Sequence, residues 1–431
     1  MTISRRHFLK ALGAGGAASA LAACAQMPGG EKATGAHVVV VGGGSGGATA
    51  AKYLRRFDSD IRVTLVEPNA TYHTCYGSNW VLGGLRTMND IAQTYGNLKD
   101  KHGVTVVQDT VIAIDPNTNR VTLASGKVLG YDKLVVSPGI SFNWATAAEG
   151  TSEATANEIP HAWKAGPQTE ILRRQLEAMP DGGVFVMVAP GNPFRCPPGP
   201  YERASMVAHY FKARKPRSKV LILDNKENFS KQGLFVAGWK ENYGDMIEWV
   251  PSSRGGQVER VDVASKTAIS DGGLNRFKAD VMNYIPPQRA GQIAHNAGLV
   301  NDTGWCPVNQ VTFQSSIHTD IHVIGDSSIA GAMPKSGHSA NSQGKLVAAA
   351  IVNALKGRDP IAPSMVNTCY SLVTPDWGIS VAAVYQFDDG SIKGVPDSGG
   401  VSPADANRDF RRMEANYTRG WYSSITADIW G

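Results

Sequence analysis

The segment HVVVVGGGSGGATAAKYLRR, residues 37–56, carries the strongest fold signal in this chain. Residues 37–41 form the short, valine-rich run that is typical of a buried parallel strand. Gly42, Gly44 and Gly47 follow in the spacing G-x-G-x-x-G, which permits a tight turn and lets backbone N–H groups approach a pyrophosphate at a helix N-terminus. We therefore expect a strand, a glycine turn and a helix that opens at Gly47.

A second strand with an acidic end completes this unit. IRVTLVE, residues 61–67, ends in Glu67, about 20 residues after Gly47, where a carboxylate can bind ribose hydroxyls. The strand, turn, helix, strand and acid in this order predict an adenine-dinucleotide site. The alternative is a structural turn that binds nothing.

Two later segments bear on which dinucleotide binds. YDKLVVSPG, residues 131–139, indicates a strand with a Pro-Gly turn, and IHVIGD, residues 321–326, indicates a strand that ends at Asp326. Both resemble segments of flavoproteins with two dinucleotide-type domains, where the acid contacts the ribityl chain or pyrophosphate of FAD. The resemblance favours FAD over NAD and assigns Asp326 to the cofactor.

A second βαβ unit lacks the glycine turn. VFVMVAP (184–190), a helix near 200–214 and KVLILD (219–224) repeat the pattern. In the turn APGNPFRCPPGPYERA, Gly191 and Gly199 do not form G-x-G-x-x-G, and the prolines remove amide donors. This unit binds NAD(P)H in two-domain flavoprotein reductases, so we expect no nicotinamide site here and a different electron donor.

The cysteines are spaced too widely for a C-x-x-C metal knuckle or redox pair. After Cys24 they are Cys75, Cys196, Cys306 and Cys369. Cys196 lies in the turn where α/β folds place their chemistry, so we expect it to face the flavin. The alternative is an inert buried thiol.

The N-terminus reads as an export signal. Arg5 and Arg6 precede Phe8, Leu9 and a run of small residues that is too short and too rich in Ala and Gly for a membrane anchor. The pattern predicts twin-arginine export, which carries folded proteins, to the periplasm. An oxidising compartment permits disulfides, and a domain of this size needs none for stability, so a disulfide here would indicate chemistry.

Composition indicates a globular protein of two or three domains. The chain has 431 residues, 42% of them hydrophobic and 18% charged, which argues against disorder and against several membrane spans. The 42 basic residues, three of them in the export signal, stand against 37 acidic residues. This near balance argues against a nucleic-acid partner.

From about residue 37 to the C-terminus, the chain resembles the flavoprotein subunit of flavocytochrome c sulfide dehydrogenase. The similar segments are VVVGGGSGGATAAKYL, TYHTCYGSN, PHAWKAGPQTEILRRQLE, FRCPPGPYERAS, IPPQRAG, MPKSGHSANSQGK, NTCYSLV, GISVAAVY and PDSGGV. The broader kinship is with sulfide:quinone oxidoreductases and glutathione-reductase-like flavoproteins. This implies an α/β fold with two Rossmann-like domains and a C-terminal α+β interface domain.

The expected domain boundaries follow from the same resemblance. The parts are a signal and linker (1–35), an FAD-binding domain (36–149 and 288–361), a second Rossmann-like domain without the NAD glycine loop (150–287), and an interface domain (362–431).

The resemblance implies specific roles for the cysteines. Cys75 matches the residue that bonds covalently through sulfur to the flavin 8α-methyl group. Cys196 and Cys369 match a redox-active disulfide on one face of the flavin. Cys306 matches no catalytic motif, and we interpret it as a structural thiol.

The implied reaction is sulfide oxidation. Hydrosulfide attacks one sulfur of the Cys196–Cys369 bond, which gives a persulfide and a thiolate, and two electrons pass into FAD. Glu202, near the first helical turn after Cys196, is a candidate base; the alternative is a solvated helix-start carboxylate. Arg203 and Lys335 are candidates to hold anionic sulfur or the charge of the reduced flavin.

The implied electron acceptor is a separate c-type cytochrome subunit in a heterodimer. The chain has no C-x-x-C-H motif, so we expect no haem attached to it. The C-terminal region holds Trp377, Trp421, Tyr422 and Trp430, which suit a protein contact, although ordinary core residues are the alternative.

Two other functions compete with this one. A sulfide:quinone oxidoreductase would need an apolar C-terminal surface, and NRDFRRMEANYTRGWYSSITADIWG shows no clear apolar helical face. A non-catalytic flavin relay would need no disulfide, so Cys196 and Cys369 argue against it.

Leu21-Ala22-Ala23-Cys24 resembles the lipobox of bacterial lipoproteins, and an ordinary cleavage site is the alternative. If the lipobox is used, the mature protein begins at Cys24 and carries acyl groups that anchor it to a membrane. Intact-mass analysis of the exported protein tests this. An unmodified N-terminus downstream of Cys24 would contradict lipidation but not export.

Overall fold

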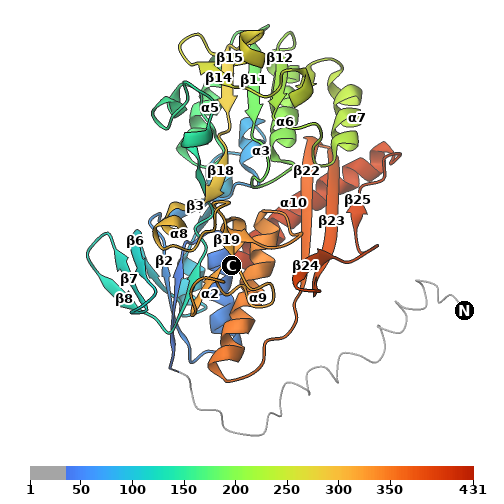
Figure 1. Cartoon of the computed structure of the whole chain (residues 1–431). Helices are drawn as coiled ribbons and strands as arrows, with labels where there is room; N and C mark the ends of the chain where they lie inside the picture. The colour runs from blue at the N-terminus through green and yellow to red at the C-terminus, as the bar shows by residue number, and fades with distance from the viewer. Residues whose placement is uncertain (1–34) are drawn as a thin grey trace, which may run out of the picture. The chain divides into compact units, whose positions relative to one another are not determined.

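The computed structural model describes residues 35–431. The predictions for Arg5, Arg6 and Cys24 fall outside this range. Within it, two parallel sheets and one antiparallel sheet form the framework, and helices pack against them (Figure 1).

The first sheet contains the predicted dinucleotide-type strands. Its five strands are parallel, in the order β20-β9-β1-β2-β5. The bounds are β1 (His37–Val41), β2 (Arg62–Val66), β5 (Thr105–Val107), β9 (Lys133–Val136) and β20 (Ile321–Val323). Helices α2 (Ser45–Phe57) and α9 (Gly337–Leu355) pack against each other beside this sheet. Strands from distant parts of the sequence thus share one buried layer.

The first helix differs from the prediction at its start. Helix α2 begins at Ser45, with Gly44 as its N-cap, rather than at Gly47. Gly47 is instead required by close packing, because an added Cβ would lie 1.9 Å from the Gly42 carbonyl oxygen. The helix therefore starts inside the glycine turn and directs its first amides toward the end of β1.

Shorter elements surround this sheet. The two-stranded pairs are β3 (Thr71–His73) with β4 (Ala92–Thr94), β10 (Ile140–Phe142) with β18 (Gln288–Ala290), and β19 (Cys306–Pro307) with β21 (Ser328–Ile329). A three-stranded sheet contains β6 (Val111–Asp115), β7 (Arg120–Leu123) and β8 (Val128–Gly130). The short helices are α3 (Ser78–Leu82), α4 (Gly96–Asp100) and α8 (Gln292–Asn296).

The second parallel sheet lies within the predicted second Rossmann-like domain. Its order is β13-β12-β11-β17, with β11 (Val184–Ala189), β12 (Lys219–Asp224), β13 (Ile247–Val250) and β17 (Val281–Tyr284). The helices of this region are α5 (Pro167–Ala178), α6 (Gly199–Arg214) and α7 (Gln232–Tyr243). An antiparallel sheet of β14 (Arg260–Asp262), β15 (Thr267–Ser270) and β16 (Asn275–Lys278) completes it.

The C-terminal region is an antiparallel sheet with one long helix. Strand β23 (Trp377–Asp388) pairs with β22 (Ser364–Thr374), β24 (Ser391–Gly394) and β25 (Gly400–Val401), which leaves β22 at an edge. Helix α10 (Arg408–Trp430) packs across β23. No helix among residues 35–431 is long and apolar enough to cross a membrane.

Helix α10 corrects two expectations. It has a continuous buried face, which the sequence pattern hid because this face includes the buried ion pair Arg411–Glu414. Tyr422 and Trp430 also lie in the core rather than on an aromatic surface. The Trp430 ring stacks on Tyr72 at 5.2 Å between centroids.

The end of α10 is tied to the first nucleotide unit by a buried lysine. Lys52 Nζ donates to the backbone oxygens of Ala427, Asp428 and Gly431 at 3.3, 2.9 and 2.7 Å. A cation at a helix C-terminus complements the helix dipole. Lys52 is 5% exposed, and burial lowers its pKa.

We expect Lys52→Met to lower the free energy of unfolding by about 1–3 kcal/mol, because three carbonyl groups lose a charged donor. Urea unfolding at pH 7 measures this. Lys99→Met, at an exposed position on α4, is the matched control and should change little. Equal stability of the two variants would contradict the role assigned to Lys52.

Candidate functional site

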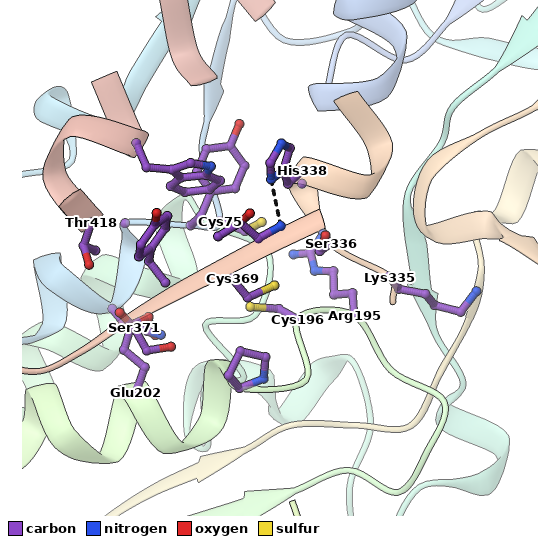
Figure 2. Close-up of a pocket in the computed structure, with 18 of the residues that line it drawn as sticks. Cys75, Arg195, Cys196, Glu202, Lys335, Ser336, His338, Cys369, Ser371 and Thr418 are labelled. Carbon is purple, nitrogen blue, oxygen red and sulfur yellow. Dashed lines mark hydrogen bonds between the residues drawn. The ribbon is translucent and has the colours of Figure 1, made fainter. Parts of the chain in front are cut away.

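Three cysteines from distant parts of the sequence line one pocket. Cys75 comes from the loop between β3 and α3, Cys196 from the turn between β11 and α6, and Cys369 from β22. Figure 2 shows the sulfur atoms of Cys196 and Cys369 pointing toward each other. Both are free thiols in the structure, so the predicted disulfide stays a prediction.

The turn holds Cys196 in an unusual backbone conformation. Its φ is +58°, its N–H donates to the Lys335 carbonyl at 2.7 Å, and its carbonyl accepts from Gly199 N at 2.8 Å. A Cβ at Gly199 would lie 3.0 Å from Cys196 Sγ and 2.7 Å from the Trp163 ring. Burial, then the neighbouring cysteines and Glu202, raise the pKa of Cys196 well above its ordinary value.

Cys369 is linked to the start of α9. Asn367 Nδ2 lies 3.5 Å from Cys369 Sγ, and Asn367 Oδ1 accepts from Ser336 Oγ at 2.5 Å. Ser336 is the N-cap of α9, and its hydroxyl accepts from Ser339 N. The thiol on β22 is thus positioned against a helix N-terminus.

A larger cavity of about 840 Å³ adjoins this pocket and fits a dinucleotide-sized cofactor. Gly42, Gly44 and Glu67, which the sequence analysis assigned to the cofactor, line it. The two cavities share Cys75, Arg195, Asp326, Ser336 and Gly337.

Particular atoms support the fit to FAD. The amide-rich start of α2 opens on the cavity, and the residue before it, Gly44, carries no side chain that would cover it. Asp326 Oδ1 is buried and, among the described residues, has no hydrogen-bond partner. A bound flavin nucleotide would supply a hydroxyl donor for that oxygen.

Glu67 already has hydrogen-bond partners in the protein. Its Oε2 accepts from Gly43 N at 2.8 Å, and its Oε1 accepts from Asn69 N at 3.0 Å and Asn69 Nδ2 at 2.8 Å. A carboxylate has about four acceptor positions, so one stays free for a ribose hydroxyl. The carboxylate is held in place before any ligand binds.

Lys335 lines the pocket with its stem, while its ammonium points away from the cysteines (Figure 2). Its Nζ donates to the carbonyls of Asp326 at 2.8 Å and Ser328 at 2.9 Å, and lies 3.8 Å from the centre of the Trp305 ring. Burial lowers the pKa of Lys335 to about 8. The ammonium therefore fixes the Asp326 backbone rather than contacting the cysteine sulfurs.

The role of Arg203 in holding anionic sulfur stays a prediction. Arg203 is 1% exposed, and its guanidinium donates to the Asn79 and Asn283 side chains and to the carbonyls of His161 and Ala162. These contacts bind α6 to the 161–162 segment, and Cys196 is the largest opposite charge that acts on the guanidinium.

Sequence reasoning missed Arg195 and His338. Arg195 lines both cavities, and its guanidinium donates to the Trp163 carbonyl. Its position next to Cys196 could have indicated it. His338 Nδ1 accepts from Thr368 N at 2.9 Å, which places the ring proton on Nε2, and burial lowers its pKa. No local pattern pointed to His338.

Glu202 is buried rather than solvated, at 8% exposure. Its Oε1 accepts from Trp80 Nε1 at 3.2 Å and from Leu372 N at 2.9 Å, and its Oε2 accepts from Asn79 Nδ2 at 3.1 Å. The carboxylate lines the pocket and also joins α6, α3 and β22. Its role as a base stays a prediction.

Cys306 lies apart, fully buried in β19, where burial raises its pKa to about 12. A thiol in such surroundings is unreactive because the thiolate is strongly disfavoured.

In the second Rossmann-like domain, protein side chains occupy the region after β12. Phe229 stacks on Tyr201 at 3.6 Å between centroids. Tyr201 Oη and Trp249 Nε1 donate to Asp224 Oδ2 at 2.6 and 2.9 Å, and Lys226 pairs with the same carboxylate. The acid at the strand end is therefore bound to the protein itself.

Family models match most of the chain. Residues 36–174 match "Pyridine nucleotide-disulphide oxidoreductase", residues 169–286 match "Sulfide dehydrogenase [flavocytochrome c] flavoprotein chain, central", and residues 361–430 match "Flavocytochrome c sulphide dehydrogenase, flavin-binding". Residues 2–22 match the signal sequence of the twin-arginine pathway, which confirms that export route.

Curated relatives are sulfide oxidoreductases. The mitochondrial sulfide:quinone oxidoreductase of Dictyostelium discoideum is 24% identical over 65% of this chain, which covers 62% of that protein's length. The sulfide-quinone reductase of Aquifex aeolicus is 25% identical over 80% of this chain and 83% of its own.

Solved structures share the fold. The Aquifex aeolicus sulfide:quinone oxidoreductase has a TM-score of 0.69 at 20% identity and covers 92% of this chain and 91% of its own. The NAD-dependent persulfide reductase of A. fulgidus has a TM-score of 0.59 at 18% identity, over 91% of this chain and 77% of its own.

The fold and the two adjoining cavities define a flavoprotein with the pyridine nucleotide-disulphide oxidoreductase fold, which confirms the predicted fold class. Within that class, two family-model matches and the curated relatives support a flavoprotein chain of flavocytochrome c sulfide dehydrogenase, related to the sulfide:quinone oxidoreductases.

Among the described residues, no group of His, Cys, Asp and Glu is arranged to hold a metal ion.

We expect Glu202→Gln to lower the free energy of unfolding by about 1–3 kcal/mol, because the new amide group would face the Asn79 amide as a second donor. Asn79 cannot turn over without loss, since its Oδ1 accepts from Arg203 Nε at 3.1 Å. Urea unfolding followed by tryptophan fluorescence measures this. Glu170→Gln, at an exposed position on α5, is the control. Unchanged stability would show that Glu202 does not hold these elements together.

Proposed function

We propose that this protein oxidises hydrosulfide at a disulfide formed by Cys196 and Cys369 and delivers the electrons through FAD to a c-type cytochrome subunit. The convergence of these two cysteines in one pocket beside the cofactor cavity carries the proposal. The matches to the two flavocytochrome c family models support the substrate and the cytochrome partner.

The residues around the pocket have separate tasks. Hydrosulfide attacks one sulfur of the disulfide, the S–S bond breaks, and the products are a persulfide and a thiolate on the other cysteine. Glu202 accepts the proton that the bound sulfur releases. Arg195 provides a positive charge where the pocket lined by the three cysteines meets the cofactor cavity.

Particular residues would hold FAD. The start of α2 would bind the pyrophosphate, Glu67 a ribose, Asp326 the ribityl chain, and Cys75 the flavin ring through a covalent bond. Bound FAD would accept two electrons at once and release them one at a time, as a haem requires. The filled region around Asp224 supports the proposal that NAD(P)H does not bind.

The electron acceptor has a second candidate. The curated relatives are named as quinone oxidoreductases, which favours a quinone. Turnover with cytochrome c and with a soluble quinone, measured on one preparation, separates the two.

A periplasmic location and lipid attachment at Cys24 are also part of the proposal. Neither is needed for the chemistry.

We expect the flavin to stay with the polypeptide after acid precipitation, and Cys75→Ser to release it into the supernatant. The reason is that Cys75 lines both the pocket that contains Cys196 and Cys369 and the cofactor cavity. Absorbance of pellet and supernatant measures this, with Cys306→Ser as the control. Free flavin from the unmodified protein would refute the covalent bond.

We expect Cys196→Ser and Cys369→Ser each to abolish sulfide-dependent reduction of the acceptor while FAD stays bound. Hydrosulfide needs an electrophilic sulfur, and a lone thiolate repels it. Turnover with sulfide measures this, and the flavin absorbance of each purified variant shows that FAD stays bound. A residual rate of about a tenth or more, equivalent to only about 1.4 kcal/mol of barrier, would mean that the disulfide is not the acceptor.

A further inference from the structure

A buried lysine from the second Rossmann-like domain contacts the strand that carries Cys369. Lys231 Nζ donates to the Cys369 carbonyl at 3.0 Å and to Ser371 Oγ at 2.9 Å. Cys369 belongs to β22, the edge strand of its sheet. An edge strand has unpaired backbone groups on one side, so its position depends on such outside contacts.

The surroundings of Lys231 disfavour the charged form of its ammonium group. The residue is 8% exposed and takes a left-handed backbone conformation, φ +61°, at the N-cap of α7. Its two hydrogen-bond acceptors are neutral groups. A buried ammonium needs negative charge nearby to offset its desolvation. Burial lowers the pKa of Lys231 to about 8, and Cys369, Glu202, Cys196 and Glu414 act in the opposite direction.

Other charged or titratable groups also face Cys369. They are Glu202 from α6, Arg195 and Cys196 from the turn before α6, Cys75 from the loop before α3, His338 from α9, and Tyr385 from β23. Glu202 already accepts three hydrogen bonds, and burial lowers the pKa of His338, whose Nδ1 accepts from Thr368 N. Lys231 is the cation that hydrogen-bonds directly to the residue carrying the sulfur.

We propose that Lys231 is a positioning residue for Cys369, which fixes the strand at that point and places a buried positive charge behind the sulfur so that anionic sulfur on Cys369 is favoured. The inference rests on the proposed function, because hydrosulfide chemistry leaves negative charge on a cysteine of the pair. The second Rossmann-like domain, which contains Lys231, would then help to position Cys369, and this role requires no bound nucleotide. Thiolate is the reactive form of cysteine, and charge acts strongly across a buried site.

The test follows ionisation of Cys369 without any sulfide. FAD-loaded protein with Cys196→Ser is treated with methyl methanethiosulfonate from pH 5 to 10, and peptide mass spectrometry gives the modification rate at Cys369. We expect Lys231→Met and Lys231→Gln to raise the midpoint of this rate by about one pH unit or more, which is at least a tenfold loss of rate at low pH. Lys231→Arg should keep the original midpoint.

Lys215→Met is the matched control. Lys215 is also 8% exposed, and its Nζ donates to two carbonyls, those of Glu177 and Met179, at the far end of α6. Its removal should leave the Cys369 midpoint unchanged. Lys231→Gln keeps a donor for the two acceptors without the charge, so it carries the test if Lys231→Met does not fold.

A midpoint unchanged in Lys231→Gln would overturn the inference, because the charge would then have no effect on the sulfur. An equal shift in Lys215→Met would also overturn it. The unmodified protein could fail to oxidise sulfide while Lys231→Gln still raises the midpoint for Cys369 modification. That result would refute the proposed function but not the role of Lys231.

Discussion

The buried carboxylate of Glu202 is the point on which the arrangement of the pocket depends. Its oxygens accept from Asn79 and Trp80 of α3 and from Leu372 of β22. Helix α3 follows the Cys75 loop, α6 follows the Cys196 turn, and β22 carries Cys369. All three cysteines are therefore carried by elements that meet at one anion. Hydrogen bonds to a buried charge are strong, and removal of the acceptor leaves several donors without a partner.

The sequence predicted those parts of the fold that local pattern determines. The strands at 37–41 and 184–189 and the acid at Glu67 were all visible as periodicity and spacing, because each depends on neighbours close in the chain. The start of α2 was misplaced, because G-x-G-x-x-G spacing does not distinguish a cap from a packing glycine. The hydrogen bonds of Arg203 to the 161–162 segment were not predicted, because a basic residue after a cysteine gives no sign of where its side chain points.

Long-range features were beyond local reasoning. The meeting of Cys196 with Cys369 came from family resemblance, since no spacing rule connects residues so far apart. The buried face of α10 was missed because Arg411 and Glu414 neutralise each other inside it. Lys231 and His338 could not be recognised as site residues from the sequence, because their hydrogen bonds to β22 form only when this strand lies between α7 and α9.

The contacts of α10 with the glycine turn constrain how the protein is assembled. Trp430 Nε1 donates to the Gly43 carbonyl at 3.3 Å, and Lys52 holds the last turn of the helix. The ribosome makes residues 42–47 long before residues 408–430, so the nucleotide turn acquires its final packing only after α10 has been synthesised. Folding therefore cannot proceed to completion domain by domain from the N-terminus. A pathway that threads an unfolded chain through a membrane would have to build this contact on the far side, whereas the twin-arginine route lets the cytoplasm finish it first.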